Sequence, residues 1–225
     1  MNHHAPLVRR AAMLLLIGPL AALCLTVPVL ASPGESLQEK SEAAKVARKM
    51  ERARAKAQGA EEEREALRDF QKEVADYAEL HAKQLAKLGS RQEPAARQKA
   101  LAHAIAAKRA KARPGDIFQT EVQPLFRRLI EEQLKGPDTL AARKAVVEGN
   151  PVDEADSVPV VVRVNTEYPI GATRSTVPPS VLLTLPPLPA CLHYRFVGRD
   201  LILVDSVAQL IVDFLPAAAP DLAVK

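Results

Sequence analysis

Cys191 and His193 are the residues whose types and spacing best suit metal chemistry. A thiolate and an imidazole are common ligands of zinc and related metals. One residue separates them, so in a β-strand both side chains would lie on the same side of the sheet. Two ligands do not complete a site, and folding could add the carboxylates of Asp200, Asp205 and Asp213. Because aspartate also accepts backbone hydrogen bonds in hairpin turns, we favour a structural role and assign no metal ligand.

The rest of the chain offers no arrangement typical of an enzyme. Its sequence contains no phosphate-binding loop and no catalytic triad motif. The paired carboxylates at Glu61–Glu63 and Glu131–Glu132 fall on expected helices beside basic neighbours, with no pocket signal for acid–base work. His81 and His103 lie along alanine-rich helix faces, where we expect tolerated surface or seam residues. We therefore expect no enzyme, no catalytic residue and no cofactor.

The first 31 residues have the pattern of a secretory signal peptide. Arg9 and Arg10 precede an apolar run, and small residues end it at Ala31. A lipoprotein modified at Cys24 and a retained membrane anchor are the alternatives. We expect cleavage near Ala31, export to the periplasm or the cell exterior, and no transmembrane segment afterwards. Cys191 would then be the only cysteine, either a half-buried thiol or the donor of an intermolecular disulfide.

Residues 32–113 predict a long helical arm. Ser36 begins a capping-box sequence, and the following 50 or so residues are rich in alanine and charge up to Gly89, which corresponds to a helix about 75 Å long. Apolar and small residues recur at heptad spacing, most clearly from Leu67 to Tyr77. Ser90 begins a second capping-box sequence and a second helix that we expect to end near Ala112. A short connection favours an antiparallel hairpin or coiled coil.

The remaining residues predict a small core. In residues 114–149 we expect a third helix, capped by Asp116 and carrying a broad apolar face with Pro124 inside it, and then a short fourth helix. Residues 150–225 predict a strand at 158–165, an extended proline-rich segment, and a three-stranded antiparallel meander whose first turn lies at Gly198–Arg199 or at Arg199–Asp200. The expected fold class is α+β, with the third helix covering the meander.

A basic run suggests what the arm could contact. No acidic residue occurs between Arg97 and Arg113, and the run contains six basic residues: Arg97, Lys99, Lys108, Arg109, Lys111 and Arg113. Nucleic acid is not expected, because the signal peptide directs the chain to the envelope and no aromatic residue is interleaved for base stacking. Anionic lipid or another envelope polyanion suits the run better, and a solvated helix surface is the alternative.

Two resemblances concern the second half of the chain. The stretches "GDIF" and "LFRRLI" between Gly115 and Ile130, together with "YRFVGRDLILVD" and "LIVDF", resemble a group of uncharacterised exported bacterial proteins, and this resemblance implies no activity. The tail is also similar to the C-terminal β module of RcnB-like periplasmic proteins, which are implicated in nickel and cobalt homeostasis. The matching residues are Pro186, Pro187, Tyr194, Asp200, Leu203 and Asp205.

These observations favour a non-catalytic exported protein that binds or scaffolds other components. Its helical arm would mediate self-association or contact with an envelope protein or anionic lipid. The alternative is a metal-homeostasis factor of the bacterial envelope that uses Cys191 and His193.

Overall fold

The computed structural model describes residues 37–89, 93–136, 139–148, 158, 160–169, 172 and 177–221. The expected signal peptide and the two predicted serine caps, Ser36 and Ser90, lie outside these residues. The chain divides into two units, Met1–Arg48 and Lys49–Lys225. In the first unit the described residues are the beginning of helix α1. The second unit has an α+β fold, as its sequence predicts.

Helix α1 spans Leu37–Lys87 and continues through Gly59. Within the second unit its residues 49–62 are exposed apart from Gly59, which is half-buried. Burial begins at Ala66 and follows the predicted seam through Phe70, Val74 and Tyr77. The partners of this seam are the described core residues of the same chain, whereas the sequence suggested a coiled coil. The large apolar side chains of α1 therefore mark where it joins the body.

Three further helices follow before the first strand in the described part of the chain, and their bounds depart from the prediction at two points: the second helix ends at Lys108 instead of near Ala112, and the third begins later than expected. They are α2 (Pro94–Lys108), α3 (Gln123–Leu134) and α4 (Leu140–Glu148). The third helix begins at Gln123 instead of Ile117, because Pro124 occupies its first turn, where a proline lacks no needed hydrogen bond. Asp116 accordingly does not cap it and accepts a hydrogen bond from the amide of Arg113. Helix α2 has 15 residues and α1 has 51, so a hairpin of the two could pair only a fraction of α1.

In the part of the chain that the structure describes, four antiparallel strands form the sheet, in the order β1-β4-β3-β2. Their bounds are Thr166–Glu167 for β1, Leu192–Val197 for β2, Asp200–Asp205 for β3 and Leu210–Leu215 for β4. The last three make the predicted meander. Val197 pairs with Asp200 across a two-residue turn, where Gly198 has a φ of 59°, a conformation that glycine adopts without steric cost.

Two segments around the sheet differ from the prediction. The expected strand at 158–165 is not formed in the described residues: Val160 and Val162 pack on the sheet from a segment outside any strand, and β1 follows it. The proline-rich segment, expected to be extended, contains the short helix α5 (Pro179–Leu182), because proline is favoured in a first helical turn.

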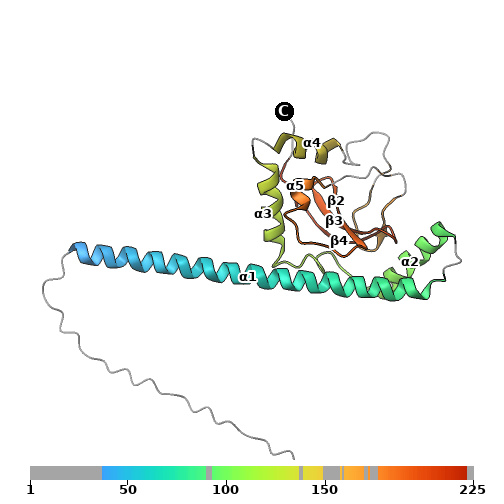
Figure 1. Cartoon of the computed structure of the whole chain (residues 1–225), viewed down its shortest axis with the longest axis horizontal. Coiled ribbons are helices and arrows are strands. Elements are labelled where there is room, and N and C mark those ends of the chain that lie inside the picture. Colours follow the sequence, from blue (N-terminus) through green and yellow to red (C-terminus); the bar gives the residue numbers. More distant parts are fainter. Residues whose placement is uncertain are drawn as a thin grey trace, which may run out of the picture. The chain divides into compact units, whose positions relative to one another are not determined.

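The sheet is covered on both faces. One face carries Tyr194, Phe196, Leu201 and Leu203, which belong to the main core with α1, α2 and α3. The other carries Ile202 and other apolar side chains under the segment that leads into β1. Phe70, Phe118 and Phe126 meet at the centre of the main core, with ring centroids 4.9 to 5.7 Å apart. Figure 1 shows α3 beside the sheet, and α3 contacts both α4 and α5.

Candidate functional site

The structure separates the two residues that could begin a metal site. β2 starts at Leu192, so Cys191 precedes the strand and packs, half-buried, against the main core. His193 is exposed within the strand. The same-side placement expected for both residues would require Cys191 to lie in the strand, and it does not. Burial and the neighbouring carboxylate of Asp205 raise the pKa of the Cys191 thiol, which disfavours the thiolate that a metal would need.

Asp205 is fully buried at the end of β3, where it joins the sheet to α1. Its Oδ1 accepts hydrogen bonds from the amides of Val207 and Ala208, at 2.9 and 2.8 Å, and so closes the β3–β4 turn. Its Oδ2 accepts a hydrogen bond from the hydroxyl of Tyr77 at 2.7 Å and lies 2.5 Å from Nδ1 of His81. At this distance one of these two atoms carries a hydrogen and the other accepts it.

The sequence interpretation did not foresee the role of His81. This histidine was expected to be a tolerated surface or seam residue, and it is 6% exposed and belongs to a buried polar joint between α1 and β3. Its place on the seam, four residues after Tyr77, was the available signal, because a histidine on a buried face needs a hydrogen-bonding partner. Burial and the adjacent carboxylate of Asp205 raise the pKa of Tyr77 above its ordinary range.

Asp213 plays a second structural role, at the junction of β4 with the turn before α3. Its Oδ2 accepts from the amides of Ile117 and Phe118, both at 2.8 Å, and Oδ1 accepts from the amide of Gly115 at 2.9 Å. Gly115 has a φ of 88°, which a residue with a side chain adopts only under strain. Burial raises the pKa of Asp213, and the amide donors oppose that shift. The "GDIF" and "LIVDF" stretches of the sequence are thereby joined in one contact.

The basic run around α2 is divided between core and surface. Arg109 donates to the carbonyl of Val212 at 2.9 Å, and its guanidinium lies 5.3 Å from the centre of the Tyr77 ring. Arg97 is half-buried, whereas the four other cations are exposed: Lys99, Lys108, Lys111 and Arg113. Lys99 and Lys108 are nine residues apart, which places them on opposite sides of α2. The run therefore does not form one basic face.

The paired carboxylates make ion pairs on helix surfaces. Glu63 forms a bidentate pair with Arg128 of α3, with one contact of 2.9 Å, and this arginine lowers the pKa of Glu63. Glu61 pairs with Arg64 and Arg68 on its own helix, and Glu131 pairs with Lys135. The Glu63–Arg128 contact lies three residues before Ala66, the first buried residue of α1 in the described part of the chain.

Asp200 completes the set of candidate ligands. It accepts a hydrogen bond from the amide of Ala217 at 2.9 Å, and so it holds the chain after β4 to the start of β3. All three aspartates therefore accept hydrogen bonds from the backbone, as hairpin-turn chemistry suggests. Among the residues that the structure describes, no group of three or more His, Cys, Asp or Glu side chains could hold a metal ion.

An open groove of about 690 Å³ lies beside β2. Most of its lining is apolar and comes from the proline-rich segment, including Pro186, Pro187 and Leu188, and the polar lining residues include His193 and Arg195. Leu182 at its rim is half exposed, and Leu183 next to it is 87% exposed. The groove is a concave apolar surface with few polar groups to orient a ligand.

Of the helices that the structure describes, none combines the length and apolar composition needed to cross a bilayer.

Comparison with known proteins assigns no role to the contacts described above. No family model, no curated protein and no solved structure matches the chain.

Proposed function

We propose that the chain is a non-catalytic, exported envelope protein that binds or scaffolds another component through α1. The observation that carries this proposal is the contrast along one helix. From Ala66 onward α1 is held by the core, whereas residues 49–62 contribute to no core cluster and are exposed apart from Gly59. We call residues 49–62 the free segment of α1.

The length of the free segment is difficult to explain by stability alone. Helices in proteins gain most of their stability from tertiary packing, and the free segment makes little tertiary packing. Continuing α1 for these 14 residues places exposed side chains on the N-terminal side of the Glu63–Arg128 ion pair with α3. A segment held rigidly at one end and exposed elsewhere suits the presentation of side chains to a partner.

The buried polar groups support the non-catalytic part of the proposal. The carboxylates of Asp205 and Asp213 are occupied by hydrogen bonds that fix turns and join elements. A carboxylate engaged in this way is a poor general base, because accepting a proton would cost it those contacts.

Photo-crosslinking in intact cells tests the proposal. A photoreactive residue at Met50, in the free segment, should give adducts with an envelope component or a second copy of the chain. The same residue at Leu183, which is 87% exposed on the body, is the matched control. If position 50 gives no adduct beyond those at position 183, the free segment is not a contact surface and the proposal fails.

The test must avoid the seam residues that first suggested a coiled coil. Phe70 and Val74 are 0% and 3% exposed. Replacing them with aspartate would unfold the core, because a buried charge without a partner is strongly unfavourable. Loss of binding in such variants would therefore say nothing about the free segment.

A further inference from the structure

We infer that the free segment of α1 docks on an anionic phospholipid surface through a basic stripe made by Lys49, Arg52 and Lys56. This inference rests on the proposed function and names the partner of that segment. At spacings of three and four residues, these cations share one face of the helix, spread over about 10 Å of its length.

The charge of the stripe is not neutralised within the chain. Among the described side chains, Lys49, Arg52 and Lys56 have no ion-pair or hydrogen-bond partner. From Lys49 to Lys56 the sequence has four basic residues and one acidic residue, Glu51. Some exposed lysines elsewhere in the unit do have acidic partners: Lys72 pairs with Asp76, Lys83 with Glu79 and Lys135 with Glu131. Lys99, Lys108 and Lys111 are exposed without an ion pair among the described residues, as the stripe is, but they do not share one helix face. The stripe therefore differs from them in its alignment along one face of α1.

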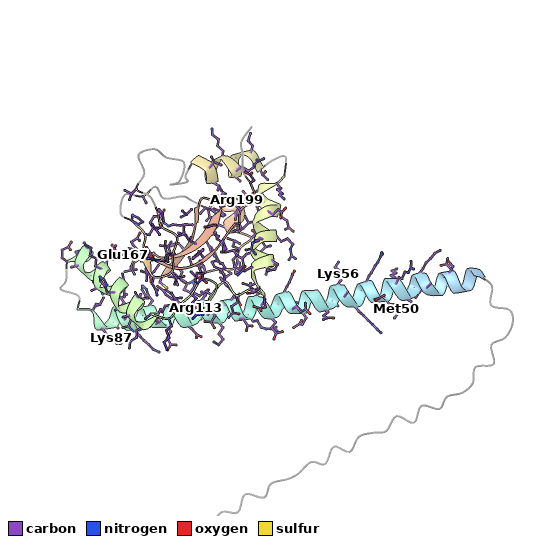
Figure 2. The ribbon with its side chains drawn as sticks, turned by 180° about the vertical axis from the view of Figure 1, so that it is seen from behind. Met50, Lys56, Lys87, Arg113, Glu167 and Arg199 are labelled. Carbon is purple, nitrogen blue, oxygen red and sulfur yellow. The ribbon has the colours of Figure 1, made fainter. Side chains whose placement is uncertain are left out.

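An apolar stripe of small residues runs next to the cations. Met50, Ala53 and Ala57 repeat the same spacing one residue further along, and Met50 is 54% exposed. Figure 2 shows the side chains of Met50 and Lys56 projecting from α1 with no other described element of the unit beside them. This combination is a basic helix face beside a weakly apolar one, which suits electrostatic contact with the charged surface of a bilayer without insertion.

A second copy of the chain fits this stripe less well than lipid does. A paired copy would bring the same excess of cations, and like charges that face each other are unfavourable. Apart from Met50, the apolar residues of the free segment are alanines, so a seam of about two heptads would bury little area.

Nucleic acid and a specific protein partner also fit less well. The free segment contains no aromatic residue to stack on a base. It also lacks the tryptophan and tyrosine anchors that dominate protein interfaces. A convex row of long cationic side chains needs no shaped partner, and a diffuse anionic surface supplies the complementary charge.

Vesicle sedimentation of the chain from residue 32 tests the inference. The chain should bind vesicles of phosphatidylcholine mixed with an equal part of phosphatidylglycerol, and should not bind phosphatidylcholine alone. Each cation contributes about fivefold to the partition, so the triple variant Lys49→Gln, Arg52→Gln, Lys56→Gln should bind about 100-fold more weakly. Raised salt should release the wild-type chain, because the contact is at the solvated surface.

The matched control is the triple variant Lys72→Gln, Lys83→Gln, Lys135→Gln, which loses the same net charge elsewhere in the unit. It should keep its partition within about twofold. An equal loss in the control, or equal binding to phosphatidylcholine alone, would overturn the inference, because either result removes the role of the stripe. Retention on heparin without any vesicle binding would overturn it as well.

The two proposals fail in different ways. Crosslinks from Met50 to an envelope protein, without vesicle binding, would overturn the lipid inference and leave the binding role of the free segment. The absence of both crosslinks and vesicle binding would overturn both.

Discussion

Removing the carboxylate of Asp205 should loosen the joint between α1 and the sheet. In the variant Asp205→Ala, the hydroxyl of Tyr77, Nδ1 of His81 and the amides of Val207 and Ala208 lose their partner together. Breaking a buried charged contact in this way costs about 3 to 5 kcal/mol of the free energy of unfolding. That is a large part of the roughly 5 to 15 kcal/mol that stabilises an ordinary domain.

Two further variants make the experiment decisive. Asp205→Asn keeps the shape and one carbonyl oxygen, so it should cost about 1.5 to 3 kcal/mol, the value of a hydrogen bond to a charged group. Asp200→Ala is the control, because its carboxylate is only half-buried and accepts one amide of the chain after β4. Its cost should be about 1 kcal/mol.

Urea unfolding followed by circular dichroism measures these free energies. The denaturant dependence should stay the same in all three variants if the unfolded states are alike. Hydrogen exchange on Asp205→Asn should rise first in α1 between Tyr77 and Gln84, because that segment loses its polar contact with β3. A cost below about 1 kcal/mol for Asp205→Ala would refute the idea that this carboxylate holds α1.

Three other predictions concern single side chains. The raised pKa of Tyr77 means that its stabilising contribution is complete below the ordinary value of 10.0 and is lost as the pH rises above it. In urea unfolding at several pH values above 10.0, the free energy of unfolding should therefore fall less steeply with pH in Tyr77→Phe than in the native chain, and equal slopes would contradict this. In thermal unfolding, Phe70→Ala should lower the free energy of unfolding by about 3 to 5 kcal/mol. Met50→Ala, on the exposed part of the same helix, should change it by no more than about 0.5 kcal/mol. Equal effects would show that the boundary between the buried and exposed parts of α1 is not where the structure has it. The Cys191 thiol should react more slowly with a disulfide reagent in the native chain than in urea, because burial raises its pKa, and equal rates would show that the thiol is not shielded.

Titration with nickel, cobalt, copper and zinc tests the metal-homeostasis alternative. Calorimetry should show no binding tighter than about millimolar that is lost in Cys191→Ser and His193→Gln, since the structure places one residue against the core and exposes the other. Tight binding abolished by both changes would restore that alternative.

Much of the fold followed from local patterns in the sequence. The long alanine-rich and charged stretch predicted α1, because alanine, glutamate, lysine and arginine lose little free energy in a helix. Alternating apolar residues around Gly198 predicted the meander and its two-residue turn. The third helix was placed too early, because Ile117 and Phe118 continue its apolar pattern although their amides serve Asp213. The spacing of apolar residues shows which side chains can be buried together. It does not show which backbone amides donate hydrogen bonds to a side chain elsewhere in the fold.

The sequence by itself determined the helical and β segments, the apolar face of each, and the unequal distribution of large apolar side chains along α1. Only the tertiary structure decided what those faces meet. The seam from Leu67 to Tyr77 suits a second helix or a sheet equally well, because hydrophobic burial has no direction. The hydrogen bonds that join Asp205 to α1 and Asp213 to the turn before α3 span 95 to 128 residues of sequence, and no local spacing indicates them. The buried position of His81 beside Asp205 and the packing of Cys191 against the main core have the same cause. In both cases the contacting residues are distant in sequence and are brought close by the rest of the fold.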